Sequence, residues 1–327
     1  MIDFDILKRF RPGVKNRVAL DIGSDSIKML EISGASEKPA LASFGIRKIQ
    51  GSSDEASVDA VKALSEELKI TVKDLNISLS GPSVVVRVIS MPDMTDEELK
   101  NAIRFETEKS IPFDINECAF DFYIQGKDVR EKNNLNILLA AAKKDSVLAK
   151  IKIAEEAGFR VNVIDVDSFA VTNAFIRNYA SIKPARTIAL LNIGATYTNL
   201  AILNDGLIAF IRDLTTGLKA VSSEKAADTG PGVKSALVSL VNEIKLSFGY
   251  HENQSGKGVD EIYISGGGAG FAGMEEAFSE TFGIKPERWD PFKFLTVDPA
   301  AINMDAPARP RSSFAVCAGL ALRGNAW

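Results

Sequence analysis

Six residues near the N-terminus have the types and spacing of a phosphate-binding turn: Asp21, Gly23, Ser24, Asp25, Ser26 and Lys28. Turn amides and serine hydroxyls donate hydrogen bonds to phosphate oxygens, and a lysine adds a positive charge. Asp21 can also orient a water molecule bound to Mg²⁺. The flanking apolar residues of 17–33 alternate with period two, which predicts two antiparallel strands joined by this turn. A purely structural hairpin is the alternative interpretation.

The pattern returns about half a chain later, over residues 187–203. This stretch aligns with the first hairpin without a gap, so Asn192 stands at the position of Asp21. The turn of the second hairpin consists of Gly194, Ala195 and Thr196. Two such hairpins predict a duplicated domain with one phosphate-facing turn in each half.

A third turn is rich in glycine and contains Gly266, Gly267 and Gly268. It lies between a predicted strand over 261–265 and a predicted helix over 272–282. Glycines allow a ligand to approach the backbone closely, and the N-terminus of a helix favours negative charge. The three turns in this order strengthen the prediction of a phosphate site.

Composition excludes several classes of protein. The chain has 327 residues, enough for two domains, and 46% of them are hydrophobic. A net charge of −4 argues against nucleic acid as a partner. Two cysteines and one histidine are too few for a disulfide framework or a histidine-based metal site. No apolar run approaches the ~20 residues that span a bilayer, and residues 1–17 resemble a disordered or docked basic tail more than a membrane-surface helix.

The hydrophobic pattern between the hairpins predicts an α/β arrangement with a smaller unit inside it. Predicted strands cover 39–49, 75–80, 83–91, 119–124, 135–141 and 161–166, and predicted helices cover 54–68, 95–110 and 145–157. Gly81 and Pro82 mark a boundary. Thr95 and Glu98 form the pattern of a capping box, and the charged helix that they begin is either a solvated surface or a partner-facing one.

Two acids and one glycine mark the ends of later helices. Asp167 is interpreted as the cap of a helix that continues through Tyr179, and the alternative is that Asp165 or Asp167 is an acid in the phosphate site. A strong amphipathic helix carries apolar residues from Ala236 to Phe248 and is expected to end near Gly249.

Beyond these local patterns, the chain resembles a known family. LDIGSDSIK, LNIGATYTNL and ISGGGAGFAG resemble the two phosphate motifs and the adenosine motif of the actin-like ATPase superfamily. Within it, NAIRFETEKSIPFDINECAFDFY, ILLAAAKKDSV, DVDSFAVTNAF and AGLALR are similar to PilM, the cytoplasmic component of type IV pilus assembly systems.

The resemblance implies an α/β fold of duplicated actin-like (ribonuclease H-like) domains. A small α/β subdomain is inserted in the first half, and the second-half subdomain is shortened. The expected division is a tail over 1–17, a first actin-like domain over 18–82 and 160–183, an inserted partner-binding subdomain over 83–159, and a second actin-like domain over 184–327 with its reduced subdomain over 212–233.

The resemblance also implies ligands and partners. ATP and Mg²⁺ would be held by the residues of the three turns, with Asp21 reaching the metal through water. A groove beside the inserted subdomain would bind the tail of a PilN-like inner-membrane protein. The chain would be cytoplasmic, recruited to the inner-membrane face through that partner. A pilus assembly motor ATPase and other copies of the chain are further expected partners.

Two departures from the family weaken the expectation for ATP. Asn192 replaces an acid that actin-like proteins usually keep near the metal, so hydrolysis should suffer more than phosphate contacts from the backbone of Gly194, Ala195 and Thr196. The short 212–233 segment removes part of the purine wall. At most a weak ATPase is expected, and a scaffold that has lost hydrolysis is favoured.

Three alternatives belong to other classes. A sugar-kinase-like phosphotransferase would need an acceptor pocket and a base, and no separate substrate domain is evident. A cell-division protein of the FtsA type would normally end in a membrane-binding helix, whereas this chain ends at Trp327. A dinucleotide oxidoreductase is suggested by Gly268, Gly270 and Gly273, but no second mononucleotide-binding half follows.

Overall fold

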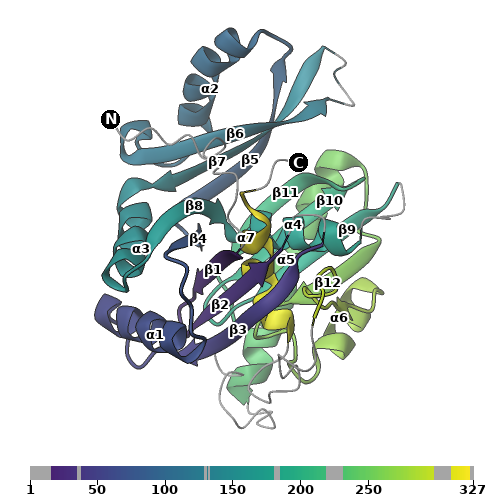
Figure 1. Cartoon of the computed structure of the whole chain (residues 1–327). Coiled ribbons are helices and arrows are strands. Elements are labelled where there is room, and N and C mark those ends of the chain that lie inside the picture. Colours follow the sequence, from purple (N-terminus) through teal and green to yellow (C-terminus); the bar gives the residue numbers. More distant parts are fainter. Residues whose placement is uncertain are drawn as a thin grey trace.

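The computed structural model describes residues 16–34, 38–128, 131, 133–179, 185–218, 231–297 and 311–324, and the side chains of all of these except 96 and 231–234. Two five-stranded sheets and one three-stranded sheet carry the fold. Helices lie between the two large sheets and on their outer faces, and the small sheet lies beside them (Figure 1). The α/β class expected from the sequence is therefore confirmed.

The first large sheet has the order β3-β2-β1-β4-β8. Its strands are β1 (Asn16–Ile22), β2 (Ser26–Ser33), β3 (Ala40–Lys48), β4 (Asp74–Leu79) and β8 (Arg160–Val166). Strands β1 to β3 are antiparallel neighbours, whereas β4 runs parallel to β1 and to β8. The outer face is covered by α1 (Asp54–Glu67) and α3 (Lys144–Glu156), whose apolar stripes pack on it.

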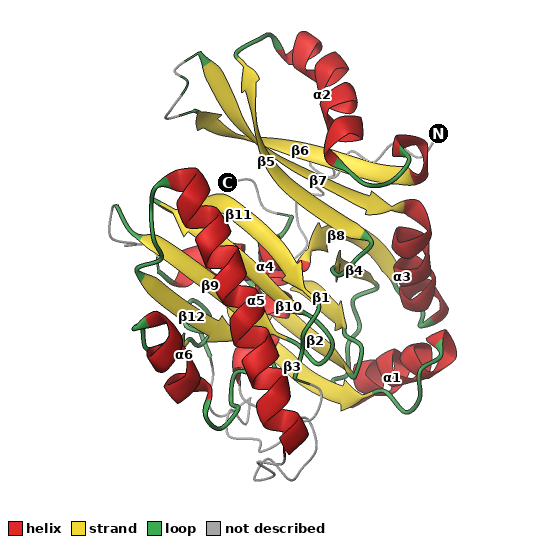
Figure 2. Cartoon of the chain, turned by 180° about the vertical axis from the view of Figure 1, so that it is seen from behind, coloured by secondary structure: helices red, strands yellow, loops and turns green. Residues whose placement is uncertain are grey.

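The second large sheet repeats this order as β11-β10-β9-β12-β13. Its strands are β9 (Thr187–Ile193), β10 (Thr198–Asn204), β11 (Leu207–Leu214), β12 (Glu261–Ser265) and β13 (Glu287–Arg288). Helices α5 (Pro231–Ser255) and α6 (Met274–Phe282) cover its outer face (Figure 2). Two sheets with one strand order confirm the duplication that the repeated hairpins predicted.

Two helices lie between the large sheets and belong to one core with both: α4 (Asp167–Asn178) and α7 (Ala315–Leu322). Every residue of α7 is buried. The helices cross where Gly319 meets Ala170, and a Cβ on Gly319 would lie 1.7 Å from the Ala170 carbonyl oxygen. Only glycine allows this close crossing, so one position fixes how the halves meet.

The small sheet has the order β5-β7-β6. Its strands are β5 (Val84–Pro92), β6 (Cys118–Lys127) and β7 (Asn134–Lys143), and a short 3₁₀ turn, Ile115–Glu117, precedes β6. Helix α2 (Asp96–Ser110) packs on one face of this sheet. Its capping box is present as predicted: the Thr95 side chain accepts from the Glu98 backbone amide, and the Glu98 side chain accepts from the Thr95 backbone amide.

Two local predictions are wrong. Asp167 does not cap α4: the N-cap residue is Val166, and no side chain makes a capping hydrogen bond to the first turn of this helix. Helix α5 does not end at Gly249 but continues to Ser255. His251 is buried in this last part, so tertiary packing outweighs the roughly 1 kcal/mol that a helical glycine costs. Although α5 has 25 residues, no helix in the described ranges is long and apolar enough to cross a membrane.

Other expectations lie wholly or mostly outside the described residues. The basic tail of 1–17 is described only from residue 16, and residues 219–230 of the reduced subdomain are not described. The division into domains stays a proposal, and the two repeated sheets and the separate small sheet support it.

Candidate functional site

The first predicted turn brings an acid and a lysine together. Asp21 near the end of β1 faces Lys28 near the start of β2, and Lys28 Nζ lies 2.7 Å from Asp21 Oδ2. Burial lowers the pKa of Lys28, but the charge and hydrogen bond of Asp21 outweigh it, so the pKa is raised. The turn closes through the Gly23 amide, which donates to the Ser26 carbonyl at 3.2 Å. The turn therefore carries a charged lysine beside its backbone.

A second buried acid, Asp167, belongs to this site. It accepts hydrogen bonds from Ser78 and Ser80, which follow one another closely at the end of β4. Burial and then the charge of Asp21 raise the pKa of Asp167 to about 6. The structure therefore places Asp167 near Asp21, in keeping with the alternative weighed for this residue, an acid in the site. A signal was available: Asp167 follows a parallel strand at its carboxyl end, where ligand-binding residues gather.

Lys150 on α3 is the residue that the sequence did not reveal. Its Nζ donates to the Ile22 carbonyl, just before the first turn. Burial lowers the pKa of Lys150, while the negative charges of Asp167 and Asp21 oppose that effect. The site therefore contains two acids and two lysines, of which Asp21 is buried and Asp167, Lys28 and Lys150 are half-buried.

Asp165, two residues before Asp167, has a structural role instead. Its carboxylate lies 2.7 Å from Arg323 Nε, just after α7. Burial raises the pKa of Asp165, and the Arg323 charge partly offsets the rise. This ion pair ties β8 to the C-terminal helix and leaves Asp167 as the acid that faces Asp21.

The second turn has the same shape with different chemistry. In the aligned repeat Asn192 and Asn199 occupy the positions of Asp21 and Lys28, and Asn192 Nδ2 donates to Asn199 Oδ1 at 2.9 Å. An amide pair thus replaces the ion pair. The Gly194 amide donates to the Tyr197 carbonyl at 2.9 Å, so it closes the turn rather than pointing to a phosphate as expected. Ala195 is half-buried and Thr196 is exposed.

The third turn follows β12 as predicted, and its glycines differ in their surroundings. A Cβ on Gly266 would lie 2.4 Å from the Ile193 carbonyl oxygen, and one on Gly268 would lie 2.5 Å from Ile193 Cγ2. Gly267 is exposed and has open space around it. Two of the three glycines therefore allow the turn to pack on the end of β9, and Gly267 leaves its backbone accessible.

The first two turns meet directly. Ser24 Oγ and Thr196 Oγ1 are hydrogen-bonded at 2.7 Å, so the predicted phosphate residues of both halves come together. Asp25 lies in the first turn and its carbonyl accepts from the Ile49 amide at 2.9 Å. A phosphate group between the turns would replace the Ser24–Thr196 bond, with Lys28 and Lys150 as nearby cations.

Asp21 and Asp167 place two carboxylates at the site. Burial and then the charge of Asp21 raise the pKa of Asp167, and a divalent cation would offset both effects. Within the described ranges no three acidic, cysteine or histidine side chains gather as a metal site. These residues fit Mg²⁺ that keeps most of its water and contacts phosphate, which is its usual mode of binding.

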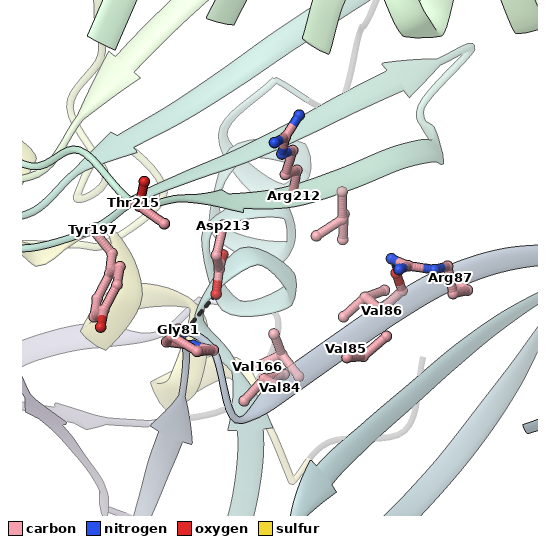
Figure 3. A pocket seen from close by; sticks show the side chains of 12 residues that line it. Gly81, Val84, Val85, Val86, Arg87, Val166, Tyr197, Arg212, Asp213 and Thr215 are labelled. Carbon is pink, nitrogen blue, oxygen red and sulfur yellow. Dashed lines mark hydrogen bonds between the residues drawn. The ribbon is translucent and has the colours of Figure 1, made fainter. Parts of the chain in front are cut away.

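A groove lies beside the site, between the small sheet and the second large sheet (Figure 3). It encloses about 220 Å³. Its walls come mainly from β5 and β11, the edge strands of their sheets: Val84, Val85, Val86, Arg87, Ile211, Arg212 and Asp213. Tyr197 of the second turn and Gly81 line one end, and Arg87 lies at the other.

The repeated sheets, the central helices and the meeting turns define the class of the protein: it has the actin-like ATPase fold. Solved structures at low identity show the same fold. An ethanolamine utilization protein, EutJ from Carboxydothermus hydrogenoformans, matches with a TM-score of 0.51 and 13% identity over 96% of this chain and 92% of its own. A Bacteroides thetaiotaomicron protein with an actin-like ATPase fold matches with a TM-score of 0.50 and 10% identity over 88% and 95%.

The particular family follows from a closer match. The chain belongs to the family described as type IV pilus assembly protein PilM, whose model matches residues 19–228 and 234–325. A structure described as the PilM-PilN type IV pilus biogenesis complex is 26% identical, with a TM-score of 0.83 over 96% of this chain and 99% of that chain. The resemblance found in the motifs is confirmed across the chain.

Proposed function

We propose that the chain is an actin-like scaffold of a type IV pilus assembly platform and that its groove binds the cytoplasmic tail of a PilN-like membrane protein. The observation that carries this is the near-full-length likeness to a PilM-PilN complex, together with a groove between two edge strands. A related type II secretion-like platform is the neighbouring possibility within the same proposal.

The groove has the form that an extended peptide requires. Edge strands present backbone groups to an added chain, and the apolar side chains around them supply pockets. Side chains bond to backbone between the elements on either side of the groove: Asp213 Oδ2 accepts from the Gly81 amide at 2.6 Å, and, outside the groove lining, Gln125 exchanges two bonds with Ile208, at 2.9 and 3.0 Å. These bonds hold β11 beside the small sheet and keep the groove walls in place.

Binding of a synthetic PilN-like tail to the purified chain tests this function. Val84→Glu places a charge on the half-buried groove wall and should raise the tail Kd at least tenfold, because a desolvated charge there has no partner. Leu148→Glu is the matched control, since Leu148 is 49% exposed on α3, which does not line the groove. Equal loss of binding in both variants, or no binding of the tail at all, would refute the proposed groove.

The second part of the proposal concerns ATP and Mg²⁺. The first turn, with Asp21, Lys28 and the added Asp167 and Lys150, supports a phosphate site, and Asp21 would reach the metal through water. Hydrolysis is weak or lost because Asn192 offers an amide, already bonded to Asn199, where a carboxylate would orient water. No acceptor substrate or catalytic base is proposed.

Calorimetry with Mg-ATP tests this site. Gly23→Asp should abolish binding, because a Cβ there already lies 2.9 Å from the Ser26 carbonyl oxygen and a carboxylate would repel phosphate. A melting curve of the variant confirms that the fold remains. Micromolar binding that survives this substitution would place the nucleotide elsewhere.

The remaining parts of the proposal concern location and partners. The chain would act on the cytoplasmic face of the inner membrane, held there by the PilN-like protein. A pilus assembly motor ATPase and other copies of the chain would be further partners, and nucleic acid would not. Co-fractionation with membranes that depends on the PilN-like protein is the measurement that checks this.

A further inference from the structure

A row of three polar side chains crosses the second sheet at one level. In the register of β9, β10 and β11, Asn192 is opposite Asn199, and Asn199 is opposite Asp213. Asn192 Nδ2 donates to Asn199 Oδ1 at 2.9 Å, and Asn199 Nδ2 donates to Asp213 Oδ1 at 2.8 Å. Because an ionised carboxylate only accepts, Asp213 fixes the orientation of the Asn199 amide and hence that of Asn192.

The row ends on the other half of the molecule. The second oxygen of Asp213 accepts from the Gly81 amide at 2.6 Å, at the junction between β4 and β5 (Figure 3). Each oxygen of Asp213 therefore holds one of two bonds, one inside the second sheet and one across the groove. Asp213 and Gly81 both line the groove.

The other end of the row lies at the second turn. Asn192 is two residues from Gly194, whose amide bonds to Tyr197, and Thr196 bonds to Ser24 of the first turn. Tyr197 also lines the groove, and a Cβ on Gly81 would lie 3.2 Å from its ring. The second turn thus contributes Tyr197 to the groove wall and Thr196 to the contact with the first turn.

We propose that Asp213 couples the two sites, so that a phosphate-bearing ligand held between the turns changes the affinity of the groove for its peptide. This rests on the proposed function of the groove and the turns. Ligand oxygens would replace the Ser24–Thr196 bond and shift the second turn. Tyr197 moves with the turn directly, and the Asn192–Asn199 pair carries the shift to Asp213 and so to Gly81.

Thermodynamic linkage makes the effect reciprocal. If Mg-ATP changes the tail Kd by some factor, the tail must change the ATP Kd by the same factor, and couplings between sites commonly lie between about 5 and 150-fold. Equality of the two factors therefore checks that both titrations report equilibrium binding, and the size of the factor measures the coupling.

The experiment titrates a synthetic PilN-like tail into the protein by calorimetry, with and without saturating Mg-ATP, and then titrates ATP with and without the tail. We expect at least a fivefold change in Kd, equal in both directions. Asp213→Asn should reduce the factor to less than twofold. An asparagine has one carbonyl oxygen, so it can accept from Asn199 or from Gly81 but not from both, and its NH₂ group would face the other donor. Asp205→Asn, in the β10–β11 loop, is the matched control and should keep the coupling; Asp205 pairs with Lys257 instead.

A second variant covers the case in which Asp213→Asn fails to fold, as melting curves would show. Asn199→Ser shortens the link but leaves the Asp213–Gly81 bond in place, so tail binding should persist while the coupling is lost. If the tail binds but Mg-ATP at millimolar concentration leaves its Kd unchanged, the coupling is refuted and the groove stands. If the coupling survives both substitutions, Asp213 does not carry it. Failure of the tail to bind at all refutes the groove and the coupling together.

Discussion

Substitution of Asp167 by Asn should make the protein more stable at neutral pH. The folded state raises the pKa of this carboxyl from 3.8 to about 6, first through burial and then through the charge of Asp21. A shift of roughly two units, at about 1.4 kcal/mol each, corresponds to about 3 kcal/mol. A carboxyl group whose pKa is raised by folding destabilises the folded state whenever that group is ionised. The cost is therefore absent below about pH 4, grows between pH 4 and 6, and is complete above pH 6.

The variant removes this cost because an amide is neutral at every pH and its size matches that of the acid. Its free energy of unfolding should exceed that of the parent by about 3 kcal/mol at pH 8, and the difference should shrink towards zero near pH 4. Urea denaturation at four pH values between 4 and 8 measures this, with Mg-ATP absent.

Asp165→Asn is the matched control because it removes a buried carboxyl two residues away. Burial raises the pKa of Asp165 too, so removal of its charge gains stability, but Asp165→Asn also breaks the ion pair with Arg323. Because breaking a buried pair costs about 3–5 kcal/mol, this variant should not show the stabilisation expected for Asp167→Asn at pH 8. If Asp167→Asn destabilised the protein at pH 8, or if its effect did not change with pH, the electrostatic reasoning for the site would be wrong.

Five further substitutions, two of them controls, test how the site is held. Gly319→Ala should cost about 3 kcal/mol or more in urea denaturation, because its Cβ would overlap a carbonyl of α4, whereas Gly249→Ala, in open space on α5, should gain up to about 1 kcal/mol. Gly268→Ala should cost about 1–3 kcal/mol and weaken ATP binding, while Gly267→Ala should change stability by less than about 0.5 kcal/mol. Lys150→Met should weaken ATP binding roughly tenfold by calorimetry, since a charged hydrogen bond contributes about 1.5–3 kcal/mol; an unchanged Kd would remove Lys150 from the site.

The hairpins and their turns were predictable because their signals are local: period-two apolar residues and a glycine at each turn. The repeat then predicted a duplicated domain, and the longer motifs predicted the family. Lys150 was not predictable, since it is one of several lysines on α3 and only the packing of that helix on the first sheet brings it to Ile22. Asp167 fitted the local rule for a helix cap, and its true environment depends on Asp21, which is distant in sequence.

The groove could not be read from the sequence at all. Its walls come from β5 and β11, which are more than 100 residues apart, and one end depends on a single side chain, Asp213, that bonds to the Gly81 backbone. The predicted end of α5 was wrong for a related reason: a glycine ends a helix only where tertiary packing does not favour its continuation.

The position of α7 has a consequence for the order in which the protein folds during synthesis. This helix comes late in the chain but packs on β1, β2 and β4, and Asn76 of β4 donates to the Leu320 carbonyl at 2.8 Å. The inner face of the first sheet thus stays uncovered until residues 315–322 have left the ribosome. We expect the packing between the two large sheets to be completed in one late step, because α4 alone does not cover β1 and β2, and we expect chaperones to protect the apolar strands exposed before it.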